Sequence, residues 1–262
     1  MSRTAKVKLV RVGAGQADRR LDRVAAEGPL QIRVDGTDVA VTMRTPGDDV
    51  ELALGFCLTE GIVEPGEVMG VAACPDAEGD VVEVRLRGPR PVTGIRNVYT
   101  TSSCGICGTA ALDGVRRRLP PVGDDPVTVD PAVLAALPDR LRDAQPVFAR
   151  TGGLHAAGLA TPAGELLAVC EDVGRHNAVD KLVGRLNVAG RLPAAGHVLI
   201  VSGRIAFEIV QKALWARVPV LAAVSAPTSL AIELAEQAGM TLAGFVRGGS
   251  MNVYSRADRL GA

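Results

Sequence analysis

The chain has 262 residues, 47% of them hydrophobic, which is enough for one large or two modest packed domains. Basic and acidic residues balance at 29 each, and the aromatic residues are only four Phe, two Tyr and one Trp, so the sequence disfavours a general nucleic-acid-binding protein. No apolar run approaches the roughly 18 residues that span a bilayer, and the N-terminus lacks the apolar stretch of a signal peptide, so we expect a cytoplasmic protein without a membrane partner.

The first part of the chain has the pattern of an α+β domain. Apolar and polar residues alternate over 30–34 and again over 39–43, with turn residues between them, which predicts a β-hairpin. Asp48 is expected to open a helix that carries Cys57 on its apolar face and ends at Gly61. Cys57 is therefore predicted to be a core residue.

A further strand over 82–86 leads to the glycine-rich segment 99–108, which holds Cys104 and Cys107. Apolar residues recur at helical spacing after Gly108, so the two thiols are predicted at or just before a helix N-terminus. Free N–H groups and the helix dipole stabilise a thiolate there. Such a thiolate can accept and pass on a sulfur atom, or form a disulfide.

The same CxxC spacing also occurs in zinc sites and in dithiol redox centres. A structural zinc ion needs four ligands, and the remaining cysteines, Cys57, Cys74 and Cys170, are isolated in the sequence. A thioredoxin-like centre follows the first strand of a βαβ unit, whereas about a hundred residues of a different pattern precede this CxxC. Both alternatives are less favoured, and the odd total of five cysteines indicates reduced thiols.

A connection rich in proline, glycine and aspartate spans residues 119–130, and a short helical segment follows over 131–143. We place a domain boundary after this helix. The prediction is an N-terminal α+β domain over 1–143, which includes the CxxC loop, and a second domain over 144–262.

The second domain alternates strands and helices in the order ββαβαβαβ. This order with apolar strands predicts an α/β domain whose mostly parallel sheet is covered by helices on both faces. The predicted elements are strands at 148–161 and 165–173, a helix with apolar residues from 179 to 186, a strand at 197–201, a buried helix at 205–217, a strand at 218–224, a helix ending at Gly239, and a last strand at 241–246.

Polar and glycine-rich clusters follow the strands, at residues 171–177, 202–204, 225–229 and 245–250. Ligands of open α/β sheets bind beyond the carboxyl ends of the strands. Arginines in these clusters can grip an anionic group, and adjacent glycines let backbone N–H groups approach a phosphate, so an anionic, nucleotide-containing ligand fits. Ordinary turn and cap chemistry explains any one cluster alone. His155 fits either a site or a hydrogen-bonded core position.

Together these motifs resemble the FdhD family of formate dehydrogenase accessory proteins, over most of the chain. The motifs that carry the resemblance are Cys104-Gly-Ile-Cys107-Gly, Thr151-Gly-Gly-Leu-His155, Glu171-Asp-Val-Gly-Arg-His-Asn-Ala-Val-Asp-Lys181, Ser202-Gly-Arg204, Glu208-Ile-Val-Gln-Lys-Ala213 and Phe245-Val-Arg-Gly-Gly-Ser250. The resemblance implies a cytidine-deaminase-like three-layer α/β/α fold for the C-terminal domain.

The resemblance also implies a function. It indicates a homodimeric, sulfurtransferase-type carrier that takes persulfide sulfur from a cysteine desulfurase. The sulfur goes to the molybdenum or tungsten bis(molybdopterin guanine dinucleotide) cofactor before that cofactor enters formate dehydrogenase. The cofactor is thus a bound client, and we expect no permanently bound metal.

The family's functional residues map onto two segments of this chain. Cys104 and Cys107 correspond to the cysteines that carry the persulfide, and we expect Cys104 to be the primary carrier. The cofactor-binding segment corresponds to Phe245, Val246, Arg247, Gly248, Gly249 and Ser250.

Two other functions compete with sulfur transfer. A non-catalytic chaperone would only shield the cofactor, with the cysteines as redox or docking elements. A zinc deaminase needs His-x-Glu and a downstream Pro-Cys-x-x-Cys, but Ala178 stands two residues after His176 and the CxxC lies upstream. Deamination is therefore disfavoured.

Overall fold

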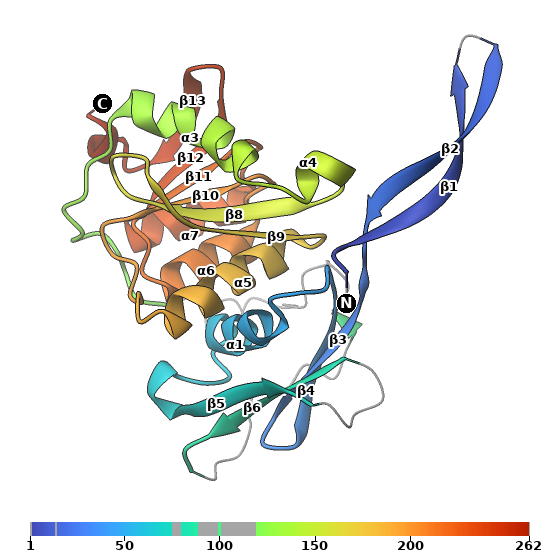
Figure 1. Cartoon of the computed structure of the whole chain (residues 1–262). Helices are drawn as coiled ribbons and strands as arrows, with labels where there is room; N and C mark the ends of the chain where they lie inside the picture. The colour runs from blue at the N-terminus through green and yellow to red at the C-terminus, as the bar shows by residue number, and fades with distance from the viewer. Residues whose placement is uncertain (1, 14, 75–79, 89–98, 101–118, 262) are drawn as a thin grey trace.

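The computed structural model describes residues 2–13, 15–74, 80–88, 99–100 and 119–261 (Figure 1). Cys104 and Cys107, and the helix expected after them, lie outside the described residues.

A six-stranded sheet forms the centre of the C-terminal part, in the order β13-β12-β11-β10-β8-β9. β10, β11 and β12 are parallel, whereas β8 and β13 are antiparallel to their neighbours, so the expected parallel arrangement holds only for the middle of the sheet. The strands are β8 (His155–Ala160), β9 (Leu166–Asp172), β10 (Val198–Val201), β11 (Val220–Ala223), β12 (Thr241–Arg247) and β13 (Ser250–Ser255).

Helices cover both faces of this sheet, as Figure 1 shows, which confirms the predicted α/β fold class. Strand residues alternate between the two faces. Leu199 and Val201 pack with α5, α6 and α7, whereas Val198 and Ile200 pack with α3 on the opposite face. The helices are α3 (Pro131–Asp143), α5 (Arg175–Val188), α6 (Phe207–Trp215) and α7 (Ser229–Ala238).

α3 has the predicted bounds, and Leu134, Leu137 and Leu141 on it belong to the core of the six-stranded sheet. The boundary between residues 143 and 144 stays a prediction.

The N-terminal part contains a five-stranded sheet in the order β5-β6-β3-β4-β7. α1 (Asp49–Thr59) packs on one face of it, and Cys57 is fully buried there, as predicted. The strands are β3 (Gly28–Val34), β4 (Thr37–Arg44), β5 (Val68–Ala73), β6 (Val81–Leu86) and β7 (Tyr99–Thr100), and short 3-10 helices are η1 (Pro65–Glu67) and η2 (Ala257–Leu260).

β3 and β4 form the predicted hairpin, but a bulge changes which side chains face inward. Ile32 pairs with Ala40, whereas Arg33 pairs with Asp38, so Val39 is the extra residue. A bulge reverses the alternation of side chains beyond it. Thr42 is consequently buried, while Met43 is 43% exposed.

The two parts of the chain meet where α1 crosses α5. Glycines occupy the crossing: a Cβ on Gly55 would lie 1.8 Å from the backbone oxygen of Asp180, and a Cβ on Gly184 would lie 1.9 Å from that of Glu51. The helix backbones are therefore in direct contact, with no room for a side chain at either glycine.

Buried charges reinforce this joint. Lys212 of α6 contacts Asp180 and Glu60, each at 2.9 Å. Burial alone would lower the pKa of Lys212, but these two carboxylates raise it above its ordinary value, so the amine stays charged. Lys181 of α5 contacts Asp172 at 2.7 Å and donates to the backbone oxygen of Thr45 at 2.8 Å.

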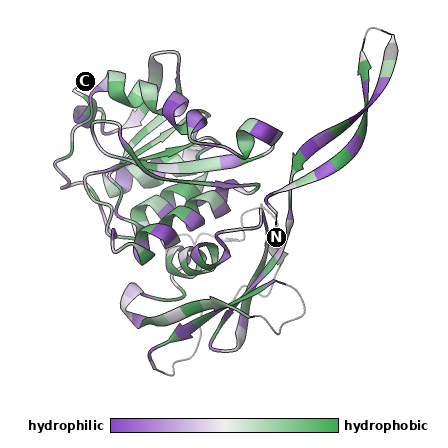
Figure 2. Cartoon of the chain, viewed as in Figure 1, coloured by the Kyte–Doolittle hydropathy of each residue, from purple (hydrophilic) through white to green (hydrophobic). Residues whose placement is uncertain are grey.

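A long two-stranded ribbon projects from the body, formed by β1 (Thr4–Gly13) and β2 (Gln16–Ala25) (Figure 1). Figure 2 shows hydrophobic and hydrophilic residues interspersed along it. No helix in the described part of the chain is long and apolar enough to cross a membrane.

The strand expected over 148–161 is wrong in its first part, because Phe148–Thr151 forms a helix, α4. The carboxylate of Glu171 accepts the N–H groups of Val147 at 3.1 Å and Phe148 at 2.7 Å, and Gly152 ends the helix in the left-handed region. The stabilising residue lies more than twenty positions along the chain, so local periodicity gives no sign of the helix. The strand at 241–246 is also not the last, because β13 follows it.

Candidate functional site: a cavity at the strand ends

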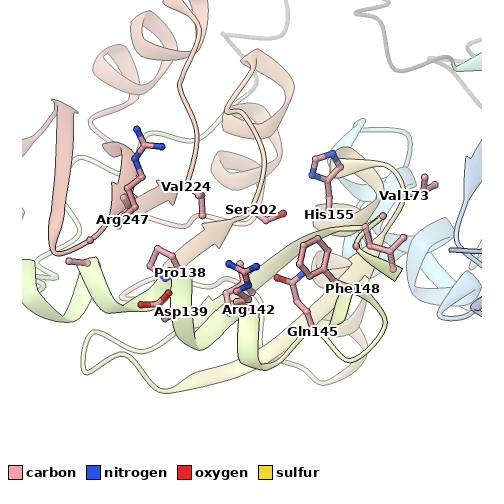
Figure 3. A pocket seen from close by; sticks show the side chains of 17 residues that line it. Pro138, Asp139, Arg142, Gln145, Phe148, His155, Val173, Ser202, Val224 and Arg247 are labelled. Atoms are coloured by element: carbon pink, nitrogen blue, oxygen red, sulfur yellow. The ribbon is translucent and has the colours of Figure 1, made fainter. Parts of the chain in front are cut away.

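A cavity of about 610 Å³ lies at the edge of the six-stranded sheet, between the strand ends and the segment from α3 to β8 (Figure 3). Its lining combines charged, polar and apolar side chains. The residues are Ala135, Pro138, Asp139, Leu141, Arg142, Gln145, Phe148, Gly152, Gly153, Leu154, His155, Val173, Ser202, Val224, Val246, Arg247 and Gly248.

The strand ends supply one wall of the cavity. The strands β9, β10, β11 and β12 all run in the same direction, so their carboxyl ends lie at one edge of the sheet. The lining residues at these ends are Val173, Ser202, Val224 and Arg247. The clusters noted in the sequence therefore meet at this edge, or adjoin it. Ser202 is held in place by its hydroxyl, which accepts the N–H of Ala156 at 2.9 Å.

The turn between β12 and β13 presents the predicted cofactor-binding segment. Gly248 and Gly249 have φ values of 57° and 78°, and Arg247 pairs with Ser250 across them. A two-residue hairpin turn of this kind needs positive φ at both positions, which glycine adopts without strain. The turn thus gives these glycines a structural role beside any role in binding.

Within that segment, Val246, Arg247 and Gly248 line the cavity. Phe245, Gly249 and Ser250 shape the backbone that carries them. Phe245 itself has a φ of 54°, at an irregularity in the pairing of β12 with β13, and it donates its N–H to the oxygen of Ser225 at 3.2 Å. The guanidinium of Arg247 lies 5.8 Å from the ring centre of Phe245.

The opposite wall comes from α3 and α4, and the sequence motifs did not indicate it. The guanidinium of Arg142 lies 5.9 Å from the ring centre of Phe148, and both line the cavity. Glu171, which fixes the first turn of α4, therefore positions Phe148 and is not itself a lining residue. Arg142 in the last turn of an amphipathic helix has the pattern of a solvent-facing residue, so the sequence offered no signal for this wall.

His155 faces the cavity at the start of β8. Burial and the nearby Arg175 lower its pKa, against a smaller opposing effect of Asp172. The ring is therefore neutral at pH 7 and able to donate from one nitrogen and accept at the other. Gly203 packs closely on this ring, since a Cβ there would lie 3.2 Å from Nδ1 of His155.

The first turn of α5 carries two further polar groups. Among the described residues, Nε of Arg175 and Nε2 of His176 are buried without a hydrogen-bond partner. His176 lies 3.9 Å from Glu208, and burial, followed by Lys212 and Arg175, lowers its pKa to about 4. The imidazole is thus neutral at pH 7.

Other polar residues of the cluster at 171–177 hold the two parts of the chain together. Asp172 accepts the N–H of Thr45 at 3.1 Å, and Asn177 donates to the oxygen of Met43 at 2.8 Å. These contacts account for the polarity of both side chains. They belong to the joint between the two sheets.

Two of the three cysteines that the structure describes are unsuited to act as nucleophiles. Cys57 and Cys170 are buried, and burial raises the pKa of each thiol to about 12. Both stay protonated at neutral pH. Cys74 is half-buried.

The segment that contains the CxxC begins beside α5. β7 ends at Thr100, four residues before Cys104, and it pairs in parallel with β4 so that Thr100 lies opposite Thr42. The hydroxyl of Thr42 donates to Oδ1 of Asn177 at 3.3 Å, in the first turn of α5. The chain therefore leaves the five-stranded sheet next to the turn that carries Arg175 and His176.

Comparisons with known proteins show which family the chain resembles over its whole length. "Sulfur carrier protein FdhD" from Streptomyces avermitilis is 53% identical, with 98% of this chain and 95% of the relative covered. The proteins described in the same words from Mycobacterium tuberculosis and Saccharolobus solfataricus are 52% and 44% identical, each with 98% of both chains covered.

Among solved structures, a candidate formate dehydrogenase accessory protein from Desulfotalea psychrophila has the same fold. Its TM-score is 0.80 at 23% identity, and 99% of this chain and 100% of that chain are covered. A model of the FdhD/NarQ family matches residues 25–261. A match over nearly the whole length means that this chain belongs to the FdhD/NarQ family.

Proposed function

We propose that this chain is a homodimeric sulfur carrier that receives persulfide sulfur from a cysteine desulfurase. It passes the sulfur to a molybdenum or tungsten bis(molybdopterin guanine dinucleotide) cofactor destined for formate dehydrogenase. The observation that carries the proposal is the match of the whole chain to relatives described as sulfur carriers. The cavity and the thiols supply the chemistry.

Cys104 and Cys107 are the cysteines best suited to carry the sulfur. Cys57 and Cys170 are buried and protonated, so neither attacks a donor persulfide. Glycines adjoin both CxxC thiols in the sequence, and a partner enzyme needs access to the nucleophile.

The transfer follows thiol exchange chemistry. The thiolate of Cys104 attacks the outer sulfur of the donor persulfide, the S–S bond of the donor breaks, and the donor cysteine leaves as a thiolate. The carrier then holds the sulfur as a persulfide. Cys107 either relays this sulfur or attacks the inner sulfur of Cys104, which closes a disulfide and releases the outer sulfur as sulfide to the acceptor.

The cavity fits the phosphate-bearing part of the client cofactor. Arg142 and Arg247 lie on opposite walls of the cavity. One arginine guanidinium can donate two parallel hydrogen bonds to two oxygens of a phosphate. A Cβ on Gly248 would meet nothing within 4 Å, so the backbone of the turn is open to a ligand. Neutral His155 and the hydroxyl of Ser202 add hydrogen-bonding groups between the walls.

Mass spectrometry tests sulfur loading. After incubation with a cysteine desulfurase and cysteine, the wild-type protein is expected to gain the mass of one sulfur atom. The double variant Cys104→Ala, Cys107→Ala should show no gain, whereas the control Cys74→Ala should load normally. Equal loading of the double variant would place the sulfur on another residue than the two CxxC cysteines, and no loading of the wild type would exclude sulfur transfer. In the second case, a chaperone that only shields the cofactor becomes the better explanation.

Calorimetric titration with guanosine diphosphate tests the cavity. Arg247→Ala is expected to weaken binding roughly 10- to 150-fold, because a hydrogen bond to a charged group contributes roughly 1.5–3 kcal/mol. Arg191→Ala replaces an exposed arginine outside the cavity lining and should leave binding unchanged. Unaltered affinity of Arg247→Ala would place the nucleotide elsewhere.

A further inference from the structure

The two ends of the cavity at the strand ends offer different chemistry. Figure 3 shows Arg247 and Asp139 at one end, and Gln145, Phe148 and His155 at the other. The first end presents a guanidinium, which suits a phosphate group. The second end presents an amide, an aromatic ring and an imidazole, and we call it the amide end. Its ligand group is therefore expected to differ from a phosphate.

Gln145 is buried, but its side chain has no hydrogen-bond partner. The residue is 4% exposed, and no residue in the described part of the chain forms a hydrogen bond with its amide. Buried polar side chains nearly always have a partner. Gln211, the other glutamine that the described residues bury, follows this rule, because its amide donates to the oxygen of Thr59 at 3.2 Å. The amide of Gln145 is thus left for a ligand of the cavity that it lines.

The backbone holds Gln145 in this position from both sides. Its N–H donates to the oxygen of Arg142 at 3.2 Å, and its oxygen accepts the N–H of Ala149 at 2.9 Å. Pro146 follows, and a proline restricts the residue before it to extended conformations. A ligand that binds the amide therefore needs little further ordering of the protein.

We propose that Gln145 binds the edge of an amino-oxopyrimidine ring, the flat heterocycle that guanine and pterin share. The choice of ring rests on the proposed function, because the client cofactor contains both groups. In this ring an N–H group lies next to a carbonyl oxygen. The amide of glutamine has the complementary pair, since its oxygen accepts from the N–H and its nitrogen donates to the carbonyl oxygen.

The neighbouring side chains suit a flat ring. Phe148 is aromatic, and heterocyclic bases stack on aromatic side chains. The guanidinium of Arg142, which is also planar, lies 5.9 Å from the centre of the Phe148 ring. Leu154 adds a buried apolar side chain, and neutral His155 adds a second hydrogen-bonding group. The amide end therefore matches the ring, while Arg247 at the other end matches the phosphates of the same molecule.

Calorimetric titration with guanosine diphosphate and with pyrophosphate tests the role of Gln145. Gln145→Met keeps the length of the side chain and removes the amide. This variant is expected to bind guanosine diphosphate roughly 30-fold more weakly than the wild type, because two neutral hydrogen bonds are lost. It should bind pyrophosphate like the wild type, since pyrophosphate has no ring. Arg247→Ala, in contrast, should weaken the binding of both compounds.

Gln211→Met is the matched control, because it makes the same substitution at a buried glutamine outside the cavity lining. It should bind guanosine diphosphate like the wild type. The melting temperatures without ligand are expected to differ as well. Gln145→Met should melt no lower than the wild type, since its amide has no partner to lose, whereas Gln211→Met should melt lower because the oxygen of Thr59 loses its donor.

Titration with neopterin, which has the pterin ring and no phosphate, separates the two sources of the ring. Weaker binding of guanosine diphosphate by Gln145→Met identifies guanine as the ring at Gln145, and weaker binding of neopterin alone identifies the pterin. If Gln145→Met bound both compounds like the wild type, or if the wild type bound neither, the proposal would be overturned. Sulfur loading of the CxxC cysteines does not involve Gln145. A Gln145→Met protein that loads sulfur and binds both compounds normally would therefore reject this inference and leave the proposed function intact.

Discussion

Replacing Gly184 with alanine is expected to destabilise the protein by about 3 kcal/mol or more, because the added methyl group has no space. A Cβ at this position would lie 1.9 Å from the backbone oxygen of Glu51 and 2.7 Å from its carbonyl carbon. Backbone atoms cannot rotate away as a side chain can. α1 and α5 must therefore separate, and the buried side chains around the crossing lose their packing.

The sign of this effect distinguishes the packing constraint from helix propensity. In an exposed helix, glycine to alanine stabilises by up to about 1 kcal/mol. Gly66→Ala in η1 is the control, since a Cβ there meets nothing within 4 Å. Denaturant titration followed by circular dichroism measures both variants. A Gly184→Ala protein as stable as the wild type would show that the helices do not touch here.

The same crossing lies between the five-stranded sheet, which leads into the CxxC segment proposed to carry sulfur, and the cavity. α1 packs on the five-stranded sheet that includes β4 and β7, and α5 begins two residues after Val173, which lines the cavity. A variant that loosens the crossing changes where Thr100 lies relative to Arg175. We expect Gly184→Ala protein that remains folded to load sulfur but to deliver it slowly.

Elements with strong periodicity were predictable from the sequence. The apolar positions of α5 recur at i, i+3, i+4 and i+7, which is the pattern of one helix face. The bounds of α3 also follow from local pattern, and its first turn is capped by Asp130, whose side chain accepts the N–H of Ala132. α4 and the β1–β2 ribbon were not foreseen. α4 depends on a carboxylate far along the chain, and the ribbon alternates charged and apolar residues without burying either face.

The cavity was predictable only in part. Strand direction brings the carboxyl ends of β9 to β12 to one edge, so Ser202 and Arg247 could be grouped from the sequence. The wall from Arg142 and Phe148 could not, because it requires knowing where α3 crosses the sheet. Conversely, Asp172 and Asn177 have the residue types of a site but serve the joint between the sheets. Residue type alone does not separate these roles.

Lys181 is another charged residue of the joint between the sheets, and replacing it is expected to destabilise the protein strongly. Its side chain is 1% exposed and that of its partner Asp172 is 0% exposed. Lys181→Met keeps the length of the side chain but removes the charge, and it leaves a buried carboxylate without its counter-ion. We expect a loss of about 3–5 kcal/mol of unfolding free energy, measured by denaturant titration at pH 7.

A double-mutant cycle shows whether the loss comes from the unpaired charge. Adding Asp172→Asn removes the carboxylate, so Lys181→Met should cost less in the Asp172→Asn background than in the wild type. Arg20→Met is the surface control: its pair with Asp18 joins side chains that are 52% and 58% exposed, and such pairs contribute about 0–1 kcal/mol. If Lys181→Met cost no more than Arg20→Met, the buried pair would not stabilise the joint. The joint would then depend on packing and on hydrogen bonds such as those of Asn177 with Met43 and of Val173 with Thr45.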